Sequence, residues 1–210
     1  MMVFFHRRVI MPVKEESSLQ SKILAAVQDV IRAAHLLKEP ASVEFIEKAS
    51  LLMVECFKQG GKVLVAGNGG SLCDAMHFTE ELTGIYRHKR PALAAIALSD
   101  PGHMSCVAND LGYDFVFSRA VEALGKPGDI LVLLTTSGNS ANLIQAVLAA
   151  RKKEITTIAF LGKTGGKLKG MTDLEWIIEG FQYSDRIQEA HMTAIHIIIE
   201  MVEKELFHDH

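Results

Sequence analysis

Residues 62–71, KVLVAGNGGS, are the stretch that decides the fold of this chain. The apolar run after Lys62 has the length and composition of a buried strand. A glycine-rich turn follows, and Ser71 is then expected to cap a helix that runs to about Thr83. A short apolar strand that passes through a tight turn into a helix is typical of parallel sheets, because parallel neighbours need crossover connections.

The same pattern continues towards the C-terminus. Helical periodicity appears after the turn in residues 137–153 and again over residues 185–206. Four more apolar runs predict strands at residues 92–98, 129–136, 155–162 and 174–178. The predicted fold class is therefore α/β, with a doubly wound, five-stranded parallel sheet that helices cover on both faces.

Two helical stretches precede the sheet, between residue 17 and about residue 59, and Gly60 and Gly61 end the second. We therefore expect one domain over residues 17–210 that includes this N-terminal helical pair. Residues 1–16 are expected to form a loose extension, with Met11 as a candidate alternative start. Their short apolar run is interrupted by Pro12 and then by charge, which makes a poor signal peptide.

Composition excludes several classes of function. The 210 residues carry a formal charge of −3, which offers no basic field for nucleic acid. The three cysteines form no C-x-x-C pair, which argues against a disulfide framework and a cysteine zinc site and favours the cytoplasm. No apolar run approaches the roughly 18 residues that would span a membrane.

Two loops that follow strands are rich in small polar residues, at residues 67–71 and 135–140. Ligands of open α/β sheets bind beyond the carboxyl ends of strands. The second loop is the stronger candidate for a phosphate, because hydroxyls and backbone N–H groups converge there before a helix N-terminus. It lacks the lysine of a P-loop, and the first loop is not a G-x-G-x-x-G dinucleotide motif. The alternative is that both loops are only strand-to-helix turns.

Two predicted helices carry groups that can hold a metal or move protons. His77 and Glu81 are four residues apart and lie on one helical face with Asp74, while Gln188 and His196 lie near one face of the last helix. Imidazole, carboxylate and amide oxygen suit zinc or a similar divalent ion, and the same groups serve as general acids and bases. Taken alone, each pair is also typical of an ordinary surface or hydrogen-bonded pair.

Six motifs in order resemble the sugar isomerase (SIS) domain family: GNGGS at 67–71, CDAMHFTEELTG at 73–84, SCVANDLG at 105–112, TSGNSAN at 136–142, TGGK at 164–167 and DRIQEAH at 185–191. The resemblance covers about residues 20–207 and is closest to the bacterial branch that isomerises a phosphorylated heptose. It implies a flavodoxin-like sheet and a homotetramer with active sites between subunits. It also implies conversion of sedoheptulose 7-phosphate to D-glycero-D-manno-heptose 7-phosphate, the first step towards the heptose of lipopolysaccharide cores.

The resemblance also assigns residues. Glu81 and His196 are the expected catalytic pair, and the family's zinc ligands fall on His77, Glu81, Gln188 and His196. Its substrate contacts fall on Asn68, Gly69, Gly70, Glu81, Asn109, Asp110, Thr135, Thr136, Ser137, Ser140 and Gln188. The chain departs from the family at Thr135, where serine is common, and at Leu72, where histidine is common.

Three alternatives remain at this point. Some relatives bind the bacterial replication initiator and lack the pairing of Glu81 with His196, which this chain keeps. A regulatory SIS domain would sense a sugar phosphate without converting it, and would need only the phosphate loop. The third alternative is an isomerase that acts on a different sugar phosphate, because the shape of the pocket sets the preferred length of the sugar.

Overall fold

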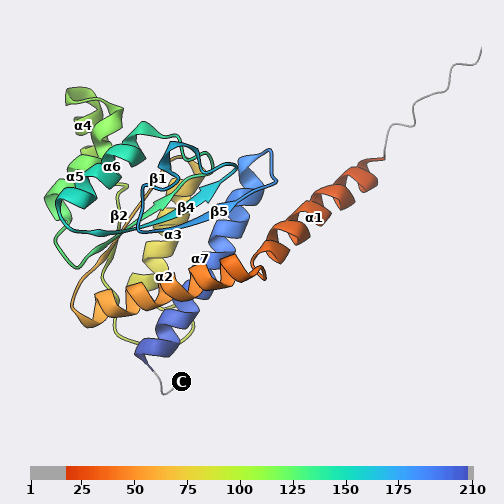
Figure 1. Cartoon of the computed structure of the whole chain (residues 1–210), viewed down its shortest axis with the longest axis horizontal. Coiled ribbons are helices and arrows are strands. Elements are labelled where there is room, and N and C mark those ends of the chain that lie inside the picture. The colour runs from red at the N-terminus through yellow and green to blue at the C-terminus, as the bar shows by residue number, and fades with distance from the viewer. Residues whose placement is uncertain (1–17, 208–210) are drawn as a thin grey trace, which may run out of the picture.

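The computed structural model describes residues 18–207 (Figure 1). The expected loose extension at 1–16 lies outside the described residues. Within them, the helices are α1 (Leu19–Leu36), α2 (Pro40–Lys58), α3 (Gly70–Thr83), α4 (Pro101–Asp110), α5 (Val116–Leu124), α6 (Ala141–Lys152) and α7 (Ser184–Leu206). The strands are β1 (Val63–Gly67), β2 (Ala95–Ala97), β3 (Ile130–Leu134), β4 (Thr156–Gly162) and β5 (Leu174–Ile178), with 3-10 turns η1 (Tyr113–Phe115) and η2 (Gly166–Leu168).

In residues 18–207 the five strands form one parallel sheet in the order β2-β1-β3-β4-β5. This is the flavodoxin-like order, so the predicted fold class is confirmed. The order reverses between β1 and β3, because the chain first moves to one edge and then returns to build the other. The loops after these two strands are the ones that the sequence marks as ligand loops.

Two apolar cores lie on the two faces of the sheet, because alternate strand residues point to opposite sides. Val63, Val65 and Val132 pack with α2, α3 and α7, while Leu64 and Leu131 pack with α5 and α6. Figure 1 shows α2, α3 and α7 on one side and α4, α5 and α6 on the other. Both faces are covered, which explains why the strands read as continuous apolar runs.

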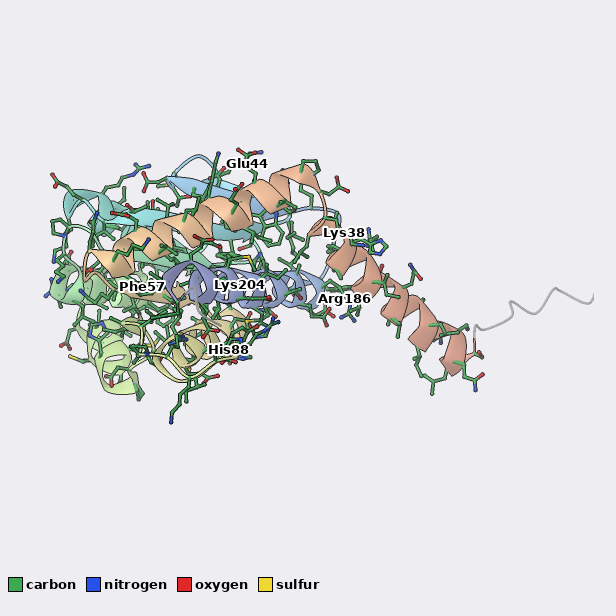
Figure 2. The ribbon with its side chains drawn as sticks, turned by 90° about the horizontal axis from the view of Figure 1, so that it is seen from below. Lys38, Glu44, Phe57, His88, Arg186 and Lys204 are labelled. Atoms are coloured by element: carbon green, nitrogen blue, oxygen red, sulfur yellow. The ribbon has the colours of Figure 1, made fainter. Side chains whose placement is uncertain are left out.

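Helix α1 stands apart from this body (Figures 1 and 2). Only its C-terminal turns pack on the body, and Ala33 is its single buried residue. Most of its apolar side chains are exposed, and they include Leu19, Ile23, Leu24 and Val27. Among residues 18–207, no helix has both the length and the apolar character to cross a bilayer.

The structure corrects two local expectations. Ser71 does not cap α3: the helix begins at Gly70, and its N-cap is Gly69, whose φ of 57° favours glycine. The run at 92–98 is a strand only over Ala95–Ala97, the three residues that pair with β1.

The sequence patterns do not predict helices α4 and α5. The signal for α4 was Asp100 followed by Pro101: the Asp100 side chain accepts a hydrogen bond from the His103 N–H, and proline occupies the first turn.

Candidate active site

A polar cavity of about 180 Å³ lies beyond the carboxyl ends of β1 and β3. Three helices, α3, α6 and α7, begin at its edge, so their N-terminal partial positive charges converge there. The lining side chains are small and polar or amide-bearing, apart from Leu134; they are Asn68, Ser71, Leu134, Thr135, Thr136, Ser137, Ser140, Ser184 and Gln188. Hydroxyls, amides and helix N-termini in this arrangement suit a phosphate without a charged side chain in the lining.

The loop at 135–140 is held in a defined shape. The N–H of Gly138 donates to Thr135 Oγ1 at 3.2 Å, and the N–H of Asn139 donates to Ser137 Oγ at 3.3 Å. Gly138 has a φ of 65°, and a Cβ there would lie 1.8 Å from the Gly165 carbonyl oxygen. Only glycine fits this close approach, which joins the TSGNSAN and TGGK motifs in space.

The side chain of Asn68 is occupied by protein partners. Its amide pairs reciprocally with that of Asn142, at 3.0 and 2.9 Å, and its Oδ1 also accepts a hydrogen bond from Tyr113 at 3.2 Å. Asn142 is buried at the start of α6, so the pair fixes the first ligand loop against the second. The sequence did not single out Asn142 or Tyr113, although Asn142 is the last residue of the TSGNSAN motif.

Gly70 and Gln188 meet where α3 begins, whereas a Cβ on Gly69 would have no neighbour within 4 Å. A Cβ on Gly70 would lie 2.7 Å from Gln188 Nε2, so glycine at this position lets α7 approach. Gln188 Nε2 donates to Ser71 Oγ at 3.4 Å. Asn109 and Asp110 lie at the end of α4, where Asn109 Nδ2 donates to Asp110 Oδ1 at 2.8 Å. These two residues are exposed and do not line the cavity.

A second cluster lies further along α3 and α7. The ligand atoms of His77, Glu81 and His196 all lie within 4.8 Å of one another. His77 Nε2 is 3.3 Å from Glu81 Oε1, and the His77 and His196 rings are 5.1 Å apart between centroids. Tyr86 stacks on His196 at 5.8 Å. Helices α3 and α7 are in contact. Helix α7 also packs on α2, and Figure 2 shows α7, marked by Arg186 and Lys204, beside α2.

Three of the four predicted metal ligands are thus brought together. Gln188 is eight residues before His196, about 12 Å along the axis of α7, and its amide faces Ser71 in the polar cavity. Two imidazoles and a carboxylate fit zinc or a similar divalent ion in donor type, and the fit of Gln188 as a fourth ligand stays a prediction.

The environment of His196 favours its neutral form. Burial lowers the pKa of the imidazole, nearby His77 and Arg87 lower it further, and Glu81 opposes them. A neutral imidazole at neutral pH is able to accept a proton. His191 is fully buried, and its Nε2 lies 3.1 Å from the Leu161 carbonyl oxygen.

Asp74 lies one turn before His77 on α3. Its Oδ2 is buried and has no hydrogen-bond partner among the described residues. Burial raises the pKa of this carboxyl to about 6, against the opposing effect of His77. The folded chain therefore holds a proton here more tightly than the unfolded chain, in which the pKa is about 3.9.

Asp74→Asn is accordingly expected to stabilise the protein in a pH-dependent way. Between pH 4 and 6 the parent loses stability as the pH rises, because the raised pKa belongs to the folded state. At pH 8 the variant should gain at least about 2 °C in Tm, the shift that about 1 kcal/mol produces in a chain of this size. At pH 4 the two melting temperatures should be nearly equal. A thermal melt series checks this, and a gain that is independent of pH would contradict it.

Comparison with known proteins identifies the family. The family model described as "SIS domain" matches residues 24–162. The phosphoheptose isomerase of Pectobacterium atrosepticum is 52% identical over 188 residues, which are 85% of this chain and 97% of that protein. That of Photorhabdus laumondii is 54% identical over 188 residues, with coverage of 85% and 97%.

Solved structures agree. Phosphoheptose isomerase from Neisseria gonorrhoeae is 39% identical, with a TM-score of 0.83 over 89% of this chain and 100% of that one. The enzyme from Francisella tularensis is 35% identical, with a TM-score of 0.84 over 89% and 99%. This chain belongs to the phosphoheptose isomerase family of SIS-domain proteins.

Proposed function

We propose that this enzyme isomerises sedoheptulose 7-phosphate to D-glycero-D-manno-heptose 7-phosphate, the first step towards the heptose of lipopolysaccharide cores. The observation that carries the proposal is the position of two groups of residues on one pair of helices. The polar cavity lies at the N-termini of α3 and α7, and the His77, Glu81 and His196 cluster lies further along the same helices. Members of the family with high identity carry the name of this activity.

The spacing of the two groups suits a long sugar phosphate. Ser71, which lines the cavity, is six residues before His77, or about 9 Å along α3. An open-chain heptose 7-phosphate places several carbons between the phosphate and the reacting carbonyl, which is enough to span this separation. The remote phosphate then contributes binding energy and orientation at the reacting carbons.

The chemistry moves one proton between neighbouring carbons. A base, Glu81 or His196, removes a proton from C1 of the ketose. The electron pair of the broken C–H bond then forms the C1–C2 double bond. The C2 carbonyl oxygen takes a proton from the second of these groups, which gives the enediol. The C1 hydroxyl then loses its proton and C2 gains one, which gives the C1 aldehyde. Two groups within 4.8 Å of each other, one carboxylate and one largely neutral imidazole, meet these requirements.

We further propose zinc as a cofactor, held by His77, Glu81 and His196 with Gln188 as the predicted fourth ligand. The nitrogen and oxygen donors within 4.8 Å support this assignment. When bound, the ion would supply electrophilic stabilisation of negative charge on the substrate oxygens. The protein's own contribution is the orientation of the imidazoles and the carboxylate on two packed helices.

A homotetramer with sites between subunits is part of the proposal. The exposed apolar side chains of α1 support it, as does an apolar groove of about 470 Å³ between α2 and α7 that includes Val43, Leu51 and Ile197. Surface of this kind is rarely left uncovered. Asn109 and Asp110 do not line the cavity of their own chain. In a tetramer they would contribute to a site that two subunits share. The proposed setting is the cytoplasm, which the free cysteines Cys56, Cys73 and Cys106 support.

An assay of purified protein with sedoheptulose 7-phosphate tests the proposed function, with product identified by NMR. The expected result is steady conversion to the aldose until equilibrium. Unchanged ketose in both zinc-loaded and metal-free samples would refute it. A matched assay with a shorter ketose phosphate measures the chain-length preference.

Ser137→Ala is expected to raise KM by about 10- to 100-fold with a smaller change in kcat. Ser137 lines the cavity, and loss of one hydrogen bond to a charged group costs about 1.5–3 kcal/mol. Steady-state kinetics against Ser105→Ala, a serine outside the cavity lining, check this. An unchanged KM would remove Ser137 from the phosphate contact.

A further inference from the structure

Glu81 lies in the last turn of α3, which ends at Thr83. The last carbonyl groups of a helix lack intrahelical partners, and this turn is where fraying begins. The N–H of Gly84 donates to the Glu80 carbonyl at 2.8 Å, and the N–H of Leu93 donates to the Leu82 carbonyl at 3.0 Å. The Glu81 carbonyl needs a partner from outside the helix. Whatever supplies it also holds the backbone that carries the Glu81 carboxylate.

Arg90 supplies that partner. Its Nη2 donates to the Glu81 carbonyl at 2.8 Å, and its Nη1 donates to the Leu82 carbonyl at 2.9 Å and to the Pro91 carbonyl at 3.1 Å. The side chain is only 1% exposed. A guanidinium presents several donors in a rigid plane, and a cation at a helix C-terminus is favoured by the helix dipole.

The other side of the same guanidinium is fixed to α7. Arg90 Nε donates to Glu203 Oε1 at 2.6 Å, and the Glu203 side chain is 5% exposed. Glu203 is seven residues after His196, so both lie on nearly the same face of α7, about 10 Å apart along the axis. One side chain therefore ties the turn that carries Glu81 to the helix face that carries His196.

We propose that Arg90 is a positioning residue for the isomerase reaction, which sets the distance between Glu81 and His196, with Glu203 as its anchor. This inference rests on the proposed function. Arg90 acts through the main chain of Glu81, and its donors point to carbonyl groups and Glu203. Its neighbour Arg87 differs: that side chain is 52% exposed and pairs with Glu200. His88, between the two arginines in sequence, lines one pocket together with Lys204 of α7; both residues are labelled in Figure 2.

Arg90→Met, Arg90→Lys and the double variant Arg90→Met with Glu203→Met test the proposal. Arg90→Met alone leaves the Glu203 charge buried, which destabilises the chain, whereas an apolar pair in place of a buried ion pair is often tolerated. The double variant therefore separates stability from positioning. The control is Lys62→Met, which breaks the ion pair of Lys62 with the fully buried Asp129 at the amino ends of β1 and β3, away from the site.

We expect kcat to fall by about 10- to 100-fold in Arg90→Met and in the double variant, because a misplacement of about 1 Å can cost about 100-fold. KM should stay within about threefold, since the phosphate cavity is untouched. Arg90→Lys, which keeps the charge, should recover part of kcat. Amide hydrogen exchange of residues 76–85 should accelerate in Arg90→Met and not in Lys62→Met, whose kcat should stay within about twofold of the parent.

Parent kcat in a folded double variant would overturn the proposal, as would an equal loss of kcat in Lys62→Met. Unchanged hydrogen exchange at residues 76–85 in Arg90→Met would also overturn it. If the parent itself converts no sugar phosphate, the proposed function fails, while the exchange measurement still decides whether Arg90 holds the last turn of α3.

Discussion

Glu81→Gln is expected to lower kcat by about 100- to 10,000-fold, the usual contribution of a positioned acid or base. The glutamine keeps the size of the side chain and one acceptor oxygen but cannot exchange a proton with the substrate. The Glu81 carboxylate is 19% exposed and lies 3.3 Å from His77 Nε2, so it faces the cluster rather than solvent. The measurement is steady-state turnover of sedoheptulose 7-phosphate by pure protein whose Tm matches the parent.

The matched control is Glu80→Gln. Glu80 is the adjacent carboxylate, is 68% exposed and comes no closer than 3.9 Å to His77 Nε2. Its kcat should stay within about twofold of the parent, as for most surface substitutions. Equal losses in the two variants would show that charge near His77, rather than a base at position 81, supports turnover.

His196→Gln should cause a loss of the same order. The burial that lowers the pKa of this imidazole keeps it neutral at neutral pH, where it is able to take and return a proton. In the parent, activity should fall as the pH drops below that lowered pKa, because the protonated ring is no longer a base. A pH profile of kcat in parent and variant measures both effects.

His191→Gln is the contrasting variant, five residues earlier on α7. His191 is fully buried, with burial lowering its pKa to about 4, and its Nε2 lies 3.1 Å from the Leu161 carbonyl oxygen. Its substitution should lower Tm and leave the kcat of the folded protein near that of the parent. Loss of turnover in His191→Gln with parent activity in His196→Gln would reverse the assignment.

The sheet was predictable because its three inner strands are buried on both faces. The inner strands β1, β3 and β4 read as nearly continuous apolar runs, and their connections leave little freedom in strand order. β2 was predicted too long because only Ala95–Ala97 of its apolar run pair with β1. α4 is short and has a single buried residue, Val107, so it gives almost no periodic signal.

The parts of the site that lie on a single helix or loop were predictable from the sequence. The spacing of His77 and Glu81 fixes their helical face, and the loop at 135–140 carries its own signal. The contacts of Arg90 with Glu203 and of Asn68 with Asn142 cross 113 and 74 residues of sequence. No local pattern encodes such distances. The position of Gln188 beside Ser71 likewise depends on how closely α3 and α7 pack.

The most direct test of the account is one NMR time course of sedoheptulose 7-phosphate with equal amounts of zinc-loaded parent, Glu81→Gln and His196→Gln. The account predicts that the parent forms the C1 aldehyde of the aldose, while both variants leave the ketose almost unchanged over the same period. Unchanged ketose with the parent, or parent rates in both variants, would contradict it.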